Sequence, residues 1–353
     1  AMKHYMTFLD SKVKDGILNE GPLGDWLSPE GNKNDNTLFW MAYQAADLAI
    51  VSKVARILGF SAEADAYLAQ SEAKKVDFNA IYVDRTNFKT IKSGVKTGFM
   101  GPPNANAAPE VSDKGQLMDT QASYAIPLAL NVFNANNAPH AVAHLVETIT
   151  RSNKDDQNIA RPPYSLMTGF IGTASISEAL SANGKHDIAY GLLTTKTYPS
   201  WLYSVANGAT SIWERLNSYT IENGFGGNNS MNSFNHYSFG AVAAWMYTHS
   251  LGIQRDETSP GYKHFILQPT PDPSGKISYA KGYVETMYGK ISSEWIKQGA
   301  KTTYRFRIPA NTSAQVKLPL GKLLKGGVKA NTNGDRMIFD LTAGDYEMIV
   351  ESN

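Results

Sequence analysis

The chain has 353 residues, 42% of them hydrophobic and 18% charged, which is typical of a globular protein with room for two domains. Its formal net charge is +1 and its lysines and arginines are scattered, which argues against a nucleic-acid or membrane-surface partner and favours a neutral ligand. The lack of cysteine excludes disulfides, thiolate metal sites and a cysteine nucleophile.

The N-terminus reads as an amphipathic helix, because Met2, Tyr5, Met6 and Leu9 recur at helical spacing. It lacks the apolar core of a signal peptide, and no apolar run of about eighteen residues predicts a membrane span. The compartment therefore stays open between cytoplasm, periplasm and the outside. Since the helical pattern starts without a cap, we expect an N-terminally truncated chain that self-associates as a homo-oligomer through the apolar surface near Tyr5–Leu9.

A series of helices and loops is predicted next. Helices Asn36–Leu58 and Ser61–Ile81 should form a hairpin at Gly59, with Ser61 capping the second helix. A loop rich in glycine, proline and asparagine follows at 82–114. Further helices are predicted at Leu117–Phe133, Pro139–Thr150, Met167–Ala182, Asp187–Thr194 and Tyr237–Leu251.

The sequence predicts neither a metal nor an organic cofactor. Its histidines do not have the spacing of zinc ligands. Asp155 and Asp156 are expected to form an exposed acidic turn rather than a calcium site.

The pattern changes after Gly252. Short segments rich in β-branched and aromatic residues, with turns about every 8–12 residues, predict an antiparallel β-sandwich over 253–353. Gly299 and the Gly334–Asp335 pair are expected to make hairpin turns. The expected organisation is thus a multi-domain chain, with a helical domain over 1–252 followed by a β-domain.

One stretch, Thr197–Gly240, combines tryptophan, tyrosine, glycine and asparagine around Glu214. Loops of this composition suit sugars, because aromatic rings stack on apolar sugar faces, amides bind hydroxyls and a carboxylate can catalyse hydrolysis. Trp213 can shield Glu214 from solvent and Arg215 can keep it ionised, which suits a general base. The alternative is a structural Glu–Arg pair at a helix start.

Other candidate sugar contacts lie on either side of this stretch. Asp25 could bind a pair of hydroxyls while Trp26 covers an apolar sugar face; alternatively, Asp25 caps a turn and Trp26 is core. Trp201 and Tyr203 would point the same way if the backbone there is extended, and the alternative is again a core role. His236 could donate to a sugar hydroxyl or cap the helix that follows.

Several motifs in order carry a family resemblance: GDWLSP, DTQASYAIPLAL, TGFIGT, SIWERL, SFNHYSFG, GYKHFILQP and YGKISSEW. With them, nearly the whole chain resembles the C-terminal portion of the bacterial α-L-rhamnosidases of glycoside hydrolase family 78. The resemblance implies an (α/α)6 toroid followed by a β-sandwich, and hydrolysis of terminal α-L-rhamnosides with inversion. Its partner would be a rhamnose-containing glycoside or polysaccharide.

The resemblance also implies residue roles. Glu214 matches the family's general base, and His236 matches a position that binds the sugar ring. Trp26, Trp201 and Tyr203 match aromatic positions around the rhamnose, and Trp213 and Asp25 complete the expected substrate-binding set.

The chain departs from the family pattern in one respect. The family's general acid lies in an upstream loop that this sequence does not contain, so the toroid is expected to be incomplete. Two alternatives to an active rhamnosidase therefore stay open: a sugar-binding fragment without turnover, and a toroid hydrolase that acts on another sugar.

Overall fold

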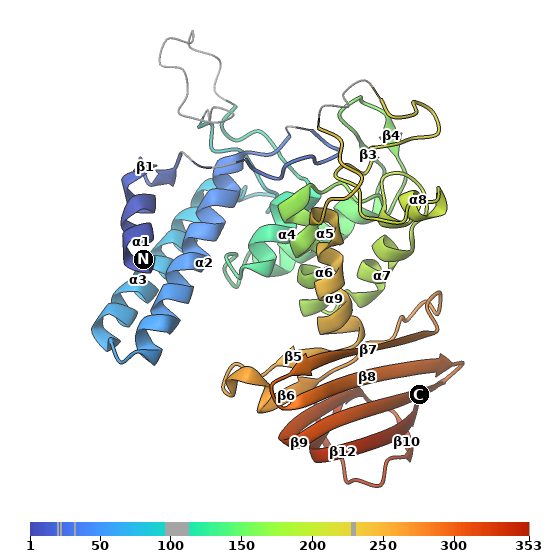
Figure 1. Cartoon of the computed structure of the whole chain (residues 1–353). Coiled ribbons are helices and arrows are strands. Elements are labelled where there is room, and N and C mark those ends of the chain that lie inside the picture. The colour runs from blue at the N-terminus through green and yellow to red at the C-terminus, as the bar shows by residue number, and fades with distance from the viewer. Residues whose placement is uncertain (20, 22, 32, 96–112, 227–230, 353) are drawn as a thin grey trace. The chain divides into compact units, whose positions relative to one another are not determined.

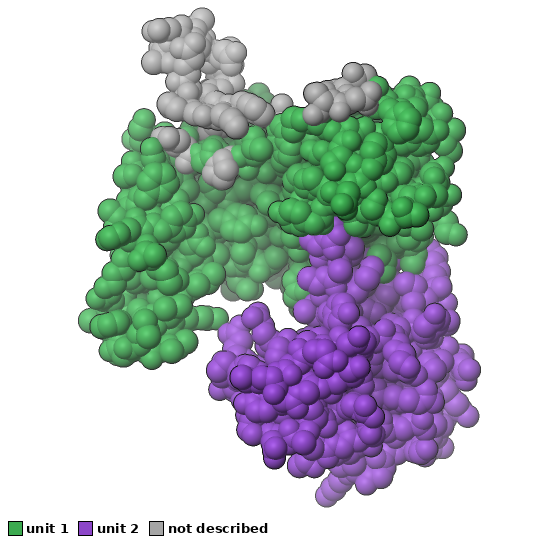
Figure 2. Space-filling model, in the orientation of Figure 1, with its two compact units in different colours: residues 1–184, 191–239 green, residues 185–190, 240–353 purple. Residues whose placement is uncertain are grey.

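The computed structural model describes residues 1–19, 21, 23–31, 33–95, 113–226 and 231–352. These residues divide into two compact units (Figure 2), of which unit 1 comprises 1–184 and 191–239 and unit 2 comprises 185–190 and 240–353. The helical segment just before residue 252 is therefore grouped with the sheet. The domain boundary expected at residue 252 stays a prediction.

Unit 1 is built mainly of helices (Figure 1). They are α1 (Met2–Ser11), α2 (Asn36–Ile57), α3 (Ser61–Tyr82), α4 (Gln121–Ala129), α5 (Ala138–Thr150), α6 (Phe170–Ala182), α8 (Trp201–Ala206) and the last turn of α7 (His186–Thr194). Two small hairpins accompany them, β1 (Val13–Lys14) with β2 (Ile17–Leu18) and β3 (Asn153–Lys154) with β4 (Ala160–Arg161). None of the described helices combines the length and the apolar character needed to cross a bilayer.

The predicted hairpin of long helices is confirmed: α2 and α3 lie side by side (Figure 1) and share a core with α4. Asp35 starts α2, because its carboxylate accepts from the Thr37 amide at 3.0 Å. The expected Ser61 cap is wrong. Ser61 is already the first helical residue, and the flanking Phe60 makes no side-chain cap bond.

Two helices begin later than predicted. Helix α4 starts at Gln121 because Thr120 and Ser123 form a capping box, and the preceding Leu117 pairs instead with Ile91 in an isolated β-bridge. Helix α6 starts at Phe170 rather than Met167. Of the loop expected over 82–114, residues 96–112 lie outside the described residues.

The exposed acidic turn predicted at Asp155 and Asp156 is confirmed for Asp156, which is exposed, and is wrong for Asp155. The Asp155 side chain is buried and forms an ion pair of 2.6 Å with Arg161 across the β3–β4 hairpin. It also accepts from the backbone amides of Gln157 and Ile159, so its role is to shape this hairpin.

Unit 2 consists of a helical segment and a sheet. The predicted helix near 237–251 is confirmed as a run of a 3-10 turn (Ser238–Ala241), whose first two residues are grouped with unit 1, then α9 (Val242–Trp245) and a π-helical turn (Met246–Ser250). The first turn of α7 belongs to this unit, where the Tyr190 hydroxyl donates to the Thr270 carbonyl at 2.7 Å and lies within hydrogen-bond distance, 2.8 Å, of Ser250 Oγ. The strands are β5 (Ile253–Arg255), β6 (His264–Leu267), β7 (Tyr279–Thr286), β8 (Gly289–Gln298), β9 (Lys301–Pro319), β10 (Lys322–Lys325), β11 (Asn331–Asn333) and β12 (Arg336–Glu351), with a 3-10 turn at Pro260–Tyr262.

All eight strands belong to one hydrogen-bonded sheet that bends around its own core. The first half of β9 pairs with β8 and the second half with β6, while β12 runs beside both halves with a register shift at 342–344. Alternate residues of both halves of β9, from Tyr304 to Ile308 and from Ala314 to Leu318, are buried in the same apolar cluster. The β6–β9 pair is parallel, and the others are antiparallel.

Both predicted hairpin turns are confirmed. Gly299 begins the two-residue turn between β8 and β9, and Gly334 begins the turn between β11 and β12. Both glycines adopt positive φ, 59° and 58°, which a residue with a Cβ seldom does.

Candidate functional site

Glu214 lies on a loop that is held against a second loop by a ladder of hydrogen bonds. The Glu214 amide donates to the Ser233 carbonyl at 2.8 Å, and the His236 amide donates to the Ile212 carbonyl at 2.8 Å. Ser211 Oγ donates to the Phe234 carbonyl in the same ladder. Residues 211–218 and 231–236 therefore form one paired segment, which brings Glu214 and His236 to the same part of unit 1.

The Glu214 side chain is half-buried, and one of its oxygens accepts from the Ser233 amide at 2.8 Å. The expected partner Arg215 turns elsewhere: its Nε donates to the Met231 carbonyl at 2.8 Å. Glu214 is thus positioned by a backbone amide rather than by the neighbouring guanidinium. A carboxylate held on one oxygen and half open to solvent keeps its second oxygen available to accept a proton.

Asp25 is buried and clamps the start of α6. Its two carboxylate oxygens accept from the Gly169 and Gly172 amides, each at 2.7 Å. Burial raises the pKa of Asp25 to about 6, although these backbone bonds oppose the rise. Asp25 therefore acts as a cap, which was one of the two roles considered for it. It caps the start of α6, 144 residues away in the sequence, and not a local turn.

Phe170, the first residue of α6, connects this clamp with the Glu214 loops. Its amide donates to the Trp26 carbonyl at 3.0 Å, next to the clamp. Its ring stacks on the His236 imidazole, with centroids 4.9 Å apart and planes at 25°, and meets Phe239 edge-on at 5.4 Å. Trp26 itself is half-buried.

His236 contacts two rings and the helix that follows it. Besides Phe170, its imidazole stacks on the exposed Tyr237, with centroids 5.5 Å apart. Its Nδ1 accepts from the Ser238 amide at 3.3 Å, so a neutral ring carries its proton on Nε2. The imidazole can therefore cap the next helix through Nδ1 and still donate to a sugar hydroxyl through Nε2. The two roles considered for His236 are compatible.

The backbone at Trp201 and Tyr203 is helical, so the extended geometry that would make the two side chains point the same way is not present. Both residues lie in α8, which begins there because Ser200 accepts from the Tyr203 amide at its N-terminus. Both are buried, at 7% exposure. Trp201 Nε1 donates to the Phe239 carbonyl at 2.8 Å, and the Tyr203 hydroxyl accepts from the Ile221 amide at 3.1 Å. These contacts support the core alternative for both.

Trp213 is also buried, at 8% exposure. It packs edge-on against Phe234, with centroids 5.3 Å apart, and Phe234 continues to Phe225. These ring contacts join the two paired segments of the ladder, because Trp213 belongs to one segment and Phe234 to the other. Trp213 also directly precedes Glu214 in the chain. Trp213 therefore backs the loop that carries the carboxylate.

Two residues were not anticipated from the sequence. The sequence signal for Phe170 is an aromatic residue between two closely spaced glycines, Gly169 and Gly172. Glu30 is 5% exposed, and burial raises its pKa to about 7, although the charges of Lys33 and Arg151 oppose the rise. No local pattern marks Glu30, because it follows Pro29 in what reads as a polar loop.

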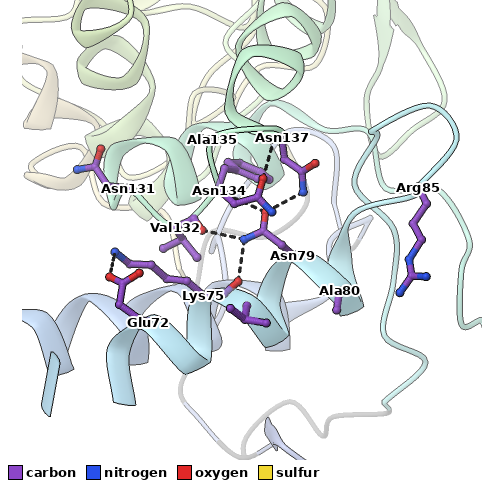
Figure 3. Close-up of a pocket in the computed structure, with 12 residues that line it drawn as sticks. Glu72, Lys75, Asn79, Ala80, Arg85, Asn131, Val132, Asn134, Ala135 and Asn137 are labelled. Carbon is purple, nitrogen blue, oxygen red and sulfur yellow. Dashed lines mark hydrogen bonds and ion pairs between the residues drawn. The ribbon is translucent and has the colours of Figure 1, made fainter. Parts of the chain in front are cut away.

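A pocket of about 590 Å³ lies elsewhere in unit 1, between α3 and the 131–137 segment (Figure 3). Asn79 lies at its centre and bonds to the Val132 carbonyl, the Asn134 amide and the Asn137 side chain. None of its described lining residues belongs to the predicted sugar site. Among the side chains that the structure describes, no group of three or more acids and histidines is placed to hold a metal ion.

Comparison with known families identifies the family of this chain. Residues 1–250 match the bacterial α-L-rhamnosidase six-hairpin glycosidase domain, and residues 252–333 match the bacterial α-L-rhamnosidase C-terminal domain. The chain belongs to the bacterial α-L-rhamnosidase family. The predicted fold class, a toroid-like helical domain followed by an antiparallel β-sandwich, is confirmed as a six-hairpin helical domain followed by a C-terminal sheet domain whose strands are mostly antiparallel.

Named relatives agree. An α-L-rhamnosidase of Formosa agariphila is 30% identical over 95% of this chain and 33% of its own length, and one of an Alteromonas species is 29% identical over 98% and 34%. The structure of a Streptomyces avermitilis α-L-rhamnosidase complexed with L-rhamnose shares the fold, with a TM-score of 0.80 at 24% identity over 99% of this chain and 30% of that one. A Dictyoglomus thermophilum α-L-rhamnosidase gives a TM-score of 0.78 at 25% identity over 99% and 36%. The chain spans about a third of the length of the curated relatives it matches.

Proposed function

We propose that this chain carries the water-activating half of an inverting α-L-rhamnosidase, with Glu214 as the general base. The observation that supports it most is the ladder between residues 211–218 and 231–236. It fixes Glu214 by one oxygen to the Ser233 amide and brings His236 to the same place. Family membership supplies the substrate class, a terminal α-L-rhamnoside.

In the proposed reaction, the free oxygen of Glu214 accepts a proton from a water molecule as the water oxygen attacks the anomeric carbon. The bond from that carbon to the aglycone oxygen breaks on the opposite face, and the electron pair leaves with the aglycone. The sugar passes through an oxocarbenium-like transition state and is released as β-L-rhamnose. His236, with its proton on Nε2, donates to a sugar hydroxyl, and Trp26 covers the sugar from its half-buried position.

The departing aglycone needs a proton when it is a sugar or an alcohol. Neither acid near Trp26 is arranged to give one. Asp25 has both oxygens bound to backbone amides, and Glu30 is buried. We infer that this chain by itself acts best on aglycones that leave as stable anions.

A second candidate is a sugar-binding protein without turnover. The state of Asp25 and Glu30 favours it, because a site without an available acid can bind an ordinary rhamnoside and leave it intact. A hydrolase with a different sugar specificity is the third reading.

Initial rates on 2,4-dinitrophenyl α-L-rhamnoside test the proposal, because this phenolate leaves without protonation. We expect turnover that falls at least about a hundredfold in Glu214→Gln, since a base is lost, and that is unchanged in the exposed control Glu222→Gln. Rhamnose binding without turnover would favour the second candidate, and turnover of other dinitrophenyl glycosides alone would favour the third.

A further inference from the structure

We infer that Asp25 is a positioning residue for the sugar-binding imidazole: its clamp on the start of α6 holds the Phe170 ring against His236. This inference rests on the proposed function, in which His236 contacts the sugar. It gives Asp25 a role different from the direct sugar contact expected from the sequence.

The first step is the clamp itself. Both Asp25 oxygens are engaged at 2.7 Å by amides one helical turn apart, Gly169 and Gly172, so the carboxylate fixes both the position and the direction of the first turn of α6. The backbone of α6 lies very close to the loop of Asp25 and Trp26 at both glycines. A Cβ on Gly172 would lie 2.8 Å from Asp25 Oδ2, and a Cβ on Gly169 would collide with the carbonyls of Asp25 and Trp26.

The second step is transmission to the ring. Phe170 lies between the two clamped glycines in the sequence, and its amide is bound by the Trp26 carbonyl at 3.0 Å. Its backbone is therefore fixed on both sides of the side chain. A ring on so constrained a backbone has few positions open to it, and the one it adopts is stacked on His236 at 4.9 Å.

The third step is the imidazole. His236 is held at its amide by Ile212 and at Nδ1 by the Ser238 amide, and its ring stacks on Phe170 and on Tyr237, which is 85% exposed. The two hydrogen bonds and the exposed tyrosine ring leave the imidazole able to tilt, whereas the Phe170 ring, whose backbone is held by the clamp, opposes tilting. Without the clamp on α6, the direction of the Nε2 donor is no longer fixed.

The test compares Asp25→Asn with a matched control. Asp35→Asn alters an equally buried helix-capping aspartate, 8% exposed like Asp25, that bonds to Thr37 and Ser93 and touches none of these residues. L-Rhamnose affinity, measured by titration on the full chain, is expected to weaken about tenfold in Asp25→Asn and to stay unchanged in Asp35→Asn. Both variants are expected to lose thermal stability, so stability alone does not separate them.

A double-mutant cycle separates positioning from direct contact. In a His236→Ala background, Asp25→Asn is expected to cause no further loss of affinity, because the residue that it positions is gone. A second tenfold loss in that background would overturn the inference, since Asp25 would then act on the sugar directly. If Asp25→Asn does not fold, Phe170→Leu carries the same cycle, because it removes the stacked ring and leaves the clamp.

The NMR signal of the His236 ring, without any sugar, distinguishes this inference from the proposed function. It is expected to shift in Asp25→Asn and Phe170→Leu but not in Asp35→Asn. An unshifted signal in folded Asp25→Asn would overturn the inference whatever the affinity. A shifted signal in a protein that binds no L-rhamnose would contradict the proposed function and leave the positioning intact.

Discussion

At the scale of single residues, burial decides what each acid of the candidate site can do. Glu214 is half-buried with one oxygen on a backbone amide, whereas Asp25 and Glu30 are buried. A base that takes a proton from water needs access to water, and a buried carboxyl lacks it. The three acids therefore differ: Glu214 is the one that the proposed reaction places next to water, Asp25 holds the start of α6, and Glu30 is buried inside unit 1.

Glu30 gives a prediction about stability and pH. Burial raises its pKa from 4.5 to about 7, so the folded protein binds this proton more tightly than the unfolded chain does. The contribution of Glu30 to the free energy of unfolding therefore falls as the pH rises from about 4.5 to about 7. Above about pH 7 this contribution no longer changes with pH. Glu30→Gln removes that loss, and its stability relative to the original protein is expected to rise by roughly 3 kcal/mol between about pH 4 and about pH 8.

Urea unfolding across this pH range measures the effect. Glu222→Gln, at an exposed position, is the control and should leave the pH dependence as it is. Parallel curves for Glu30→Gln and the original protein would show that Glu30 does not titrate in this window.

At the scale of elements, local signals predict a helix well and its exact start poorly. The α2–α3 hairpin and the turns at Gly299 and Gly334 follow from apolar spacing and from glycine, which act over a few residues. The start of α6 depends on Asp25, 144 residues earlier, and no local pattern contains that information. The start of α8 differs in this respect, because its cap, Ser200, is local to the helix and visible in the sequence.

The close fit at the start of α6 predicts a large cost for Gly169→Ala. Its φ of −87° allows alanine, but the new methyl group would collide with the backbone of Asp25 and Trp26. Since backbone cannot move aside as a flexible side chain can, we expect a loss of about 3 kcal/mol in the free energy of unfolding.

Gly208→Ala is the comparison for this change. Gly208 has open space around it and a φ of 85°, so alanine there should cost only about 1–2 kcal/mol of backbone strain. Equal or smaller losses for Gly169→Ala would contradict the contact between the 25–26 loop and α6.

The capping box of α4 predicts a moderate loss for Thr120→Ala. The Thr120 hydroxyl accepts from the Ser123 amide and donates to Asn34 at 2.6 Å, and the residue is 2% exposed. Removing this hydroxyl should lower the free energy of unfolding by about 1–2 kcal/mol, which thermal unfolding measures as a lower melting temperature. Thr150→Ala, which removes an exposed hydroxyl near the end of α5, should change it far less.

At the scale of the whole molecule, each unit has a core of its own. The sheet of unit 2 encloses one apolar cluster, and α2, α3 and α4 enclose another in unit 1. Composition and the change of period near residue 252 were enough to predict this division into helical and β-rich parts. The placement of Glu214 and His236 on one paired segment was not predictable from periodicity, since it depends on a ladder between two irregular loops.

The expected self-association belongs to this scale. Helix α1 buries Met6 but leaves Tyr5 and Phe8 about half exposed, at 51% and 53%. We expect light scattering to show a mass that increases with protein concentration, because neighbouring exposed rings favour association. Tyr5→Ser with Phe8→Ser should abolish the increase.

Tyr279→Ser with Tyr283→Ser is the matched control, because these two tyrosines of β7 are as exposed, at 66% and 53%. A constant monomer mass for the original protein at high concentration would contradict the expectation.

Azide rescue of Glu214→Ala, followed by proton NMR of the product, tests the role of Glu214 most directly. Without the carboxylate, water is a poor nucleophile, whereas azide needs no base and can occupy the space that the side chain leaves. With the dinitrophenyl rhamnoside, we expect azide to restore the rate and to yield β-L-rhamnosyl azide, while the original protein releases β-L-rhamnose first. An α-configured azide, or full activity of Glu214→Ala without azide, would contradict a general base at Glu214.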